Sequence, residues 1–261
     1  MKTVIKTIAT IGVGAFLASC GVQIQMETTV PAEVNLGKGT LVTIPLSGGT
    51  SNVNKHEWGL NAAMQDAIMS HGYYKLIEYP HPASNYVVMD VSDFRINRHE
   101  QHADFQSRVV VRNKYGLCLY SKTKETYAYK DSKGNFNWDS AYRNIADATM
   151  EELTPHRETY YERVSGDDEN PSVEEGAKAC KRGNWGTGRA YAEEALKVNP
   201  NDPEAYYLLG LIERYYKNYA SSTSYFEKAN SLKPESKYTK AIRYNAQLQR
   251  NEQIASQQLN G

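Results

Sequence analysis

The chain has 261 residues with 30 basic and 30 acidic side chains, so its formal net charge at pH 7 is zero. This balance gives no basic field that would attract nucleic acid or anionic lipid by charge alone. The length allows one large domain or two small ones. After the N-terminal segment, no apolar stretch approaches the roughly 18 residues of a membrane-spanning helix.

The N-terminal segment has the pattern of an export signal. Lys2 and Lys6 form a short basic start, and a largely apolar run over residues 4–17 follows. Residues 17–20, Leu-Ala-Ser-Cys, resemble the lipobox of bacterial lipoproteins. The resemblance implies cleavage before Cys20, a diacylglyceryl group on its thiol and an acyl chain such as palmitate on the new amine. Acyl chains at about 0.8 kcal/mol per buried CH₂ would make a durable anchor. The alternative is an ordinary secretory signal with an incidental cysteine.

Loss of the signal peptide, residues 1–19, removes Lys2 and Lys6 but no acidic residue, which leaves 242 residues with 28 basic and 30 acidic side chains. Gly21 follows the cysteine, whereas the residue that retains lipoproteins at the inner membrane is typically Asp. In a bacterium with two membranes, the resemblance therefore implies an anchor in the outer membrane, facing the periplasm. Residues 20–38 are polar and contain proline, and we expect them to form the lipidated tether.

Residues 39–164 have the pattern of an α+β domain. Runs rich in β-branched and aromatic residues predict strands, and apolar residues three or four apart predict two amphipathic helices. We expect a mixed sheet with both helices on one face. In chain order the expected elements are a strand at 40–46, a helix at 54–71, strands at 73–79, 86–97, 105–112 and 117–129, and a helix from Trp138 that ends before Pro155.

This order of elements resembles a group of bacterial lipoprotein domains. Residues 72–78, Gly-Tyr-Tyr-Lys-Leu-Ile-Glu, follow an amphipathic helix, and residues 30–34 form a proline-containing tether before the first strand. The group contains the globular domains of the curli-secretion channel lipoprotein and of lipoproteins that activate penicillin-binding proteins. The resemblance covers about residues 30–153.

A period of 34 residues follows an acidic, proline-ended segment at 165–171, which we expect to be the linker between domains. This period resembles the tetratricopeptide repeat. The resemblance implies an all-α solenoid over residues 172–261, with two repeats and a capping helix at about 238–257. The residues that recur at this spacing are Gly176 and Gly210, Ala195 and Ala229, and Pro200 and Pro234.

The second repeat, residues 203–236, matches the pattern better than the first, although Glu213 stands where an aromatic residue is usual and Ser222 where alanine is usual. Its glycine and alanine permit close helix packing, and its proline ends the second helix. Two repeats and a cap are close to the minimum for a stable solenoid, so we expect this segment to dock on the N-terminal domain or on a partner.

The first helices of such repeats line a concave groove that binds peptides. Members that clamp a terminal carboxylate use Lys and Asn where this chain has Tyr207 and Leu211, so carboxylate clamping is not expected. An aromatic and aliphatic groove with one arginine suits an extended or helical peptide. The alternative is that Tyr207 and Leu211 only pack against neighbouring helices. By the resemblance the groove residues are Tyr207, Leu211, Arg214 and Tyr215, flanked by Lys181 and Asn245.

No arrangement of catalytic residues is recognisable in the sequence, so we expect no enzyme activity and no cofactor. His99 and His102 lie between two expected strands, and a metal site needs three or four ligands, so a solvated loop is expected there. Cys118 and Cys180 are expected to be two separately buried thiols, with a disulfide as the alternative.

The leading hypothesis for function is a lipid-anchored periplasmic scaffold or adaptor that binds envelope proteins through helical repeats. The resemblances make regulation of cell-wall synthesis or assembly of a secretion complex the expected settings. The alternative is a subunit of an outer-membrane secretion ring similar to the curli channel, which would be a homo-oligomer. Pore formation is disfavoured because neither side of the strand at 117–129 is apolar. An envelope hydrolase with an unrecognised site is a third hypothesis.

Overall fold

The computed structural model describes residues 21–45, 52–78, 80–81, 83–166 and 170–260. The expected signal peptide and Cys20 therefore lie outside the described residues. The chain forms two compact units, each built from separate stretches of sequence. Among the described residues, the helical unit contains those up to Glu27 and those within Thr159–Gln247, and the sheet unit contains those within Thr28–Glu158 and those from Leu248 onward.

The sheet unit contains five strands in the order β3-β2-β4-β5-β6. Strand β2 pairs in parallel with β3 on one side and with β4 on the other, whereas β4, β5 and β6 form an antiparallel meander. This confirms the expected mixed sheet. The strands are β2 (Leu41–Thr43), β3 (Lys75–Leu76), β4 (Tyr86–Arg98), β5 (His102–Asn113) and β6 (Cys118–Tyr129).

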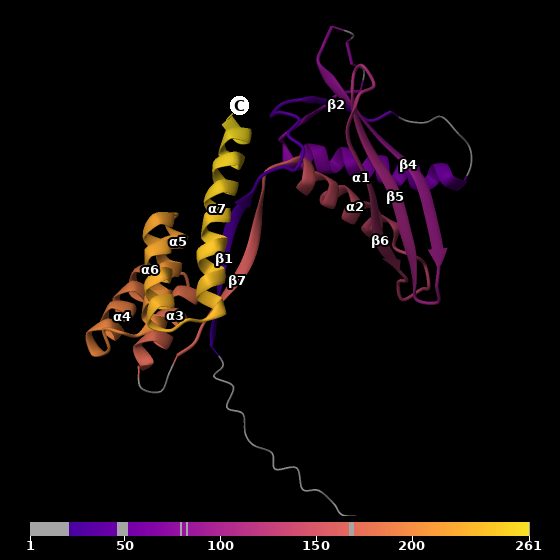
Figure 1. Ribbon diagram of the computed structural model, residues 1–261. Coiled ribbons are helices and arrows are strands. Elements are labelled where there is room, and N and C mark those ends of the chain that lie inside the picture. Colours follow the sequence, from indigo (N-terminus) through magenta and orange to yellow (C-terminus); the bar gives the residue numbers. More distant parts are fainter. Residues whose placement is uncertain (1–20, 46–51, 79, 82, 167–169, 261) are drawn as a thin grey trace, which may run out of the picture. The chain divides into compact units, whose positions relative to one another are not determined.

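Two helices, α1 (Asn52–His71) and α2 (Trp138–Leu153), cover one face of this sheet, as the sequence predicts (Figure 1). Because side chains alternate along a strand, Phe105, Val109 and Val111 of β5 point to these helices and are completely buried. Asn137 caps α2, since its side-chain oxygen accepts a hydrogen bond from the backbone N–H of Ser140 at 3.1 Å. The core therefore lies between the helices and one face of the sheet.

The other face of the sheet is left open by α1 and α2. Arg108 on β5 lies opposite Thr123 on β6, and Gln106 lies opposite Glu125, so these four side chains share that face. Arg112 on the same face forms an ion pair with Asp90 of β4 at 2.6 Å. An antiparallel sheet with one buried and one polar face is the usual outcome of such alternation.

The tether prediction for residues 20–38 is wrong over much of its length. Residues Val22–Val30 form a strand, β1, which pairs with β7 (His156–Val164) in a separate two-stranded sheet. Ile24, Met26 and Thr28 are buried while the polar residues between them are exposed. The sequence looks polar because only alternate residues of β1 are buried, and its partner strand lies more than a hundred residues away.

The helical unit contains two helical hairpins and the first part of a long helix. Gly176 lies against the neighbouring helix, because a Cβ there would be 3.1 Å from the backbone oxygen of Gly188. Gly210 lies in the same way against the ring of Phe226. The helices are α3 (Pro171–Lys181), α4 (Trp185–Val198), α5 (Pro203–Tyr215), α6 (Tyr219–Leu232) and α7 (Ser236–Asn260).

Helix α7 is longer than the expected cap and is shared between the two units. In the sheet unit, the Gln258 side chain accepts a hydrogen bond from the Ala32 N–H at 2.8 Å and donates one to the Ala32 carbonyl at 3.2 Å. The Tyr73 hydroxyl donates to the Gln258 carbonyl at 2.7 Å. The predicted division at residues 165–171 therefore differs from the observed one, because β1, β7 and α7 each contribute residues to both units.

Among the residues that the structure describes, no helix combines the length and the hydrophobicity needed to cross a membrane.

The glycine contacts predict opposite effects for two helical glycines. In Gly210→Ala the new methyl group would lie 2.4 Å from the ring of Phe226, which is completely buried and has no room to move. We expect this overpacking to reduce the free energy of unfolding by about 1–3 kcal/mol. In Gly186→Ala the methyl group meets nothing within 4 Å, so stability should be unchanged or rise by up to about 1 kcal/mol.

Urea unfolding followed by far-ultraviolet circular dichroism measures both effects. Equal unfolding midpoints for Gly210→Ala and Gly186→Ala would contradict the close packing of α5 on α6.

Candidate functional site

Four of the six residues predicted to line a peptide groove are buried in the helical unit. Tyr207, Leu211 and Arg214 on α5 are 2, 0 and 3% exposed, and Asn245 on α7 is completely buried. The predicted groove is therefore not an open surface, because other parts of the chain fill it.

Glu162 of β7 occupies this position. Its two carboxylate oxygens accept hydrogen bonds from different residues of α5: the Tyr207 hydroxyl donates to Oε2 at 2.9 Å, and Arg214 Nη1 donates to Oε1 at 2.6 Å. The Arg214 side chain is 1% exposed and that of Glu162 is 19% exposed, so this is a largely buried ion pair. A charge-assisted hydrogen bond of this kind is stronger than a neutral one.

The other donors of Arg214 are also occupied. Its Nε donates to Asn245 Oδ1 at 2.9 Å, and its Nη2 donates to the carbonyl of Ala241 at 2.8 Å. The guanidinium carbon lies 4.7 Å from the centre of the Phe226 ring and 5.6 Å from that of Tyr244. Arg214 therefore joins β7, α5, α6 and α7 at one point, and each contact stabilises its buried charge.

Burial changes the acidity of the tyrosines around this pair. The pKa of Tyr207 is raised, chiefly because burial disfavours the phenolate and further because the Glu162 carboxylate lies beside it. Burial raises the pKa of Tyr160 to about 12, although the nearby Arg214 charge acts in the opposite direction. Both tyrosines are neutral at physiological pH and serve as hydrogen-bond and packing partners, not as bases.

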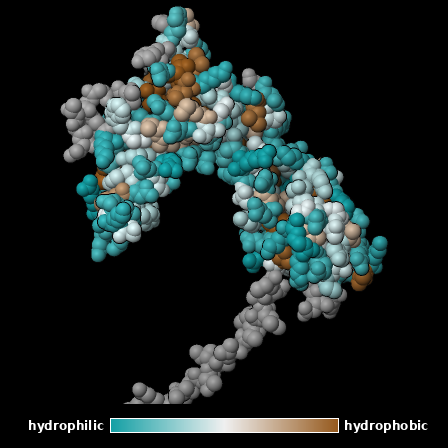
Figure 2. Space-filling model, turned by 180° about the vertical axis from the view of Figure 1, so that it is seen from behind, coloured by the Kyte–Doolittle hydropathy of each residue, from teal (hydrophilic) through white to brown (hydrophobic). Residues whose placement is uncertain are grey.

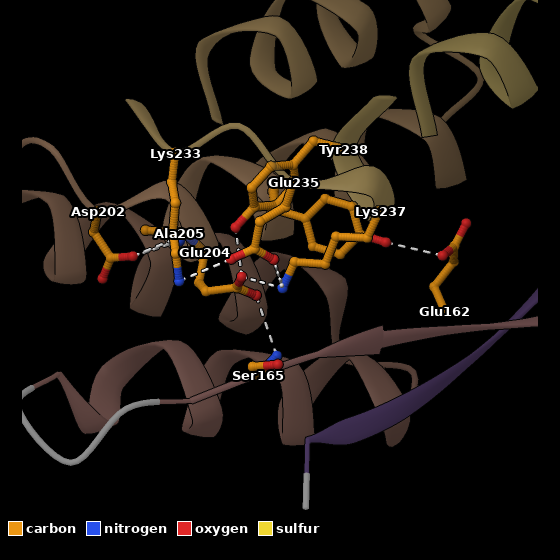
Figure 3. Close-up of polar contacts among 10 residues, drawn as sticks. Glu162, Ser165, Asp202, Glu204, Ala205, Lys233, Glu235, Lys237 and Tyr238 are labelled. Atoms are coloured by element: carbon orange, nitrogen blue, oxygen red, sulfur yellow. Dashed lines mark hydrogen bonds and ion pairs between the residues drawn. The ribbon is translucent and has the colours of Figure 1, made fainter. Parts of the chain in front are cut away.

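A second cluster holds the end of β7 at Glu204 of α5 (Figure 3). The Ser165 N–H donates to Glu204 Oε2 at 3.2 Å, and the Tyr238 hydroxyl donates to Oε1 at 2.5 Å. Lys237 forms an ion pair with the same oxygen. Asp202 caps α5 by accepting hydrogen bonds from the N–H groups of Glu204 and Ala205 at 2.9 and 3.1 Å.

The remaining predicted groove residues lie at the edge of the helical unit. Tyr215 is 47% exposed and stacks on Trp185 with ring centres 4.0 Å apart. Lys181 is exposed at the end of α3. These two residues are accessible, whereas the other four predicted groove residues are buried.

The arrangement binds a carboxylate and does so within the chain. The carboxylate that Tyr207 and Arg214 hold is the side chain of Glu162 and not a chain terminus. Sequence reasoning missed Glu162, although a lone arginine among aromatic residues in a groove implies an acidic partner. Residues 156–164 have no clear alternation of apolar and polar side chains, so the strand that carries Glu162 had little local signal.

Among the described residues, Cys118 and Cys180 are both free thiols, so the expected separate thiols and not the alternative disulfide are present. Cys180 is buried, and burial raises the pKa of its thiol to about 12. Cys118 is exposed, contrary to the expected burial, because it lies at the start of the edge strand β6.

His99 lies in the exposed turn between β4 and β5, as expected, whereas His102 already belongs to a strand. His102 begins β5, and Asp104 on the same strand lies beside both imidazoles.

A further histidine of the sheet unit, His56, is partly buried, and its Nδ1 lies 2.7 Å from the Tyr142 hydroxyl. Burial, followed by the charges of Arg98 and Lys55, lowers its pKa, so it is neutral.

No protein-family model and no curated protein matches this chain. Similar solved structures include the PelC dodecamer from Paraburkholderia phytofirmans, at 10% identity, with 50% of this chain and 96% of that chain covered and a TM-score of 0.32. A minor lipoprotein from Acinetobacter baumannii matches at 11% identity over 43% of this chain and 87% of that chain, with a TM-score of 0.27. A hypothetical protein from Chlamydia trachomatis matches at 10% identity over 44% of this chain and 96% of that chain, with a TM-score of 0.29.

The buried ion pair predicts a large effect for an almost isosteric change. Glu162→Gln leaves the Arg214 guanidinium buried without its carboxylate, and we expect it to reduce the free energy of unfolding by about 3 kcal/mol. The control is Glu174→Gln on α3, whose ion pair with Lys178 is about 40% exposed on both sides and should contribute less than about 1 kcal/mol.

Urea unfolding of each variant measures its loss of free energy of unfolding relative to the wild-type chain. A Glu162→Gln protein as stable as Glu174→Gln would contradict the description of β7 as part of the core of the helical unit.

Proposed function

We propose that the chain is a lipid-anchored scaffold of the bacterial envelope whose open sheet face, and not its helical groove, meets the partner protein. In this proposal the anchor is the acylated Cys20 in the outer membrane and the protein faces the periplasm. The chain acts by binding, without catalysis or a cofactor. Regulation of cell-wall synthesis or assembly of a secretion complex remains the expected setting.

The observation that carries this proposal is the occupied groove. Glu162 fills the position where a peptide would bind Tyr207 and Arg214. A peptide that entered there would have to displace a buried ion pair, which costs several kcal/mol. The partner is therefore expected at another surface.

The helical hairpins support the assignment of tetratricopeptide-type repeats. Gly176 and Gly210 are 34 residues apart, and each allows close contact with a neighbouring helix. Such repeats usually bind partners through the groove, whereas here the groove holds the chain's own β7. In this proposal the repeats serve to fasten the β1–β7 ribbon.

The open face of β4, β5 and β6 has the composition of a binding surface. It contains arginine together with Tyr127 and Tyr129, which are 47 and 62% exposed, and arginine and tyrosine are enriched at protein interfaces. On the side of the molecule seen in Figure 2, hydrophilic residues cover most of the surface, and a hydrophobic patch is visible near the top. A shallow hollow of about 490 Å³ lies on the open face, lined by Arg95, Ile96, Asn97, Asp104, Gln106 and Glu125.

Self-association is the second candidate. The strand β6 has 12 residues and forms one edge of the five-stranded sheet, so its outer backbone groups are available to pair with another chain. A homo-oligomer joined at this edge would correspond to the secretion-ring hypothesis.

The anchor is tested by Cys20→Ser. Because serine has no thiol to accept the diacylglyceryl group, the variant should incorporate no labelled palmitate and should be absent from the membrane fraction. Palmitate labelling followed by fractionation of cells that express the wild-type and variant chains gives the answer. A wild-type chain without label would contradict the proposed anchor.

The partner surface is tested by site-specific photo-crosslinking in intact cells. A photoreactive amino acid at Gln106 or Thr123 on the open face should give adducts with a second envelope protein, identified by mass spectrometry. The same amino acid at Tyr215 or Lys181, at the edge of the helical unit, should not. Adducts from Tyr215 and Lys181 alone would contradict the proposal, and adducts between two copies of the chain would favour the ring.

A further inference from the structure

The end of the β4–β5 hairpin brings two imidazoles and a carboxylate together. His99 follows β4, His102 begins β5, and Asp104 lies two residues further along β5. One nitrogen of each ring and the Asp104 carboxylate all lie within 4.8 Å of one another. In the described part of the chain this is the only such group of three, and neither the sequence pattern nor the proposed function accounts for it.

The distances within this cluster suit a metal ion. His99 Nε2 lies 3.0 Å from Asp104 Oδ2, and His102 Nε2 lies 3.4 Å from Asp104 Oδ1. Tetrahedral zinc with ligand bonds of 2.0–2.1 Å requires its ligand atoms to be about 3.4 Å apart. Small side-chain rotations would therefore bring both imidazoles and one carboxylate oxygen to a common ion.

The backbone holds the three residues in place. Asp104 pairs with Asn97 across the β4–β5 ladder, and the His99 N–H donates to the His102 carbonyl at 2.8 Å. His102 and Asp104 project from the same face of β5 because they are two residues apart. Ala103 between them is completely buried, which anchors the strand against the core. A metal ion would thus meet ligands that are already oriented.

The side chains around the cluster support this orientation. The rings of His99 and His102 are stacked, with centres 4.7 Å apart and planes inclined by 27°. Tyr127 packs its ring edge against His102 at 5.5 Å.

We propose that His99, His102 and Asp104 form a binding site for zinc or a similar divalent transition-metal ion, with water in the fourth position. Imidazole and carboxylate are ligands that zinc accepts, and three protein ligands with one open position are a common zinc arrangement. The cluster is partly exposed, with 49, 35 and 25% of the three side chains accessible, so an ion and a water molecule can reach it.

Another histidine–carboxylate pair supplies the control. His156 Nε2 lies 3.3 Å from Glu158 Oε1 on β7, a separation similar to those in the cluster. This pair lacks a third ligand within the described residues, and two ligands bind zinc more weakly than three. A comparison of zinc affinity at the two sites therefore isolates the effect of the third ligand.

The test is titration of the metal-free full chain with Zn²⁺ in competition with a chromophoric chelator. We expect one ion per chain at micromolar affinity, more than tenfold weaker binding in His102→Gln and in Asp104→Asn, and unchanged binding in His156→Gln. Circular dichroism establishes that each variant is folded, and a Co²⁺ spectrum reports the ligand geometry independently of affinity.

Three results would overturn the proposal: less than half an ion per chain, binding only at millimolar Zn²⁺, or equal affinity in all four proteins. In each case the cluster would be a set of histidine–aspartate hydrogen bonds and not a metal site.

Discussion

The buried contact of Arg214 with Glu162 is the interaction on which the helical unit depends. A guanidinium in a protein interior must have its charge and its donors matched, and here a carboxylate, an amide and a backbone carbonyl do so together. These partners come from β7 and α7, so the same contact that stabilises the charge also joins the ribbon to the hairpins. Residues of the ribbon and of the long final helix pack in the same hydrophobic core as the two helical hairpins and enlarge it.

The occupied groove changes where a partner is expected. Binding at the groove would require loss of the Glu162 contacts, whereas the open face of β4, β5 and β6 needs no rearrangement. Its side chains come from strands whose other sides are packed on α1 and α2, so the surface is rigid and its arginine and tyrosine residues have defined positions. A rigid surface loses little conformational entropy on binding.

The sequence predicted the elements whose formation depends on residues close to one another along the chain. The apolar spacing predicted α1 and α2, the β-branched runs predicted β4, β5 and β6, and the 34-residue period predicted the close helix packing at Gly176 and Gly210. It was insufficient where distant segments meet. Only alternate residues of β1 are apolar, and its pairing with β7 has no local signal. The same limit explains the candidate site: Tyr207 and Arg214 could be placed on a groove, but Glu162 could not, and Asp104 joins His99 and His102 only through the β4–β5 register.

Hydrogen–deuterium exchange of the β7 amides measures whether the helical unit holds its own strand. An isolated two-stranded ribbon is only marginally stable in water, so slow exchange over residues 159–164 requires packing in the groove. We expect slow exchange in the wild-type chain and much faster exchange in Arg214→Met, with the same exchange of the β4 and β5 amides in both proteins. Rapid exchange in the wild-type chain, or no change in Arg214→Met, would contradict the packing of β7 in the groove. Either result would favour the predicted role of the groove as a peptide-binding surface.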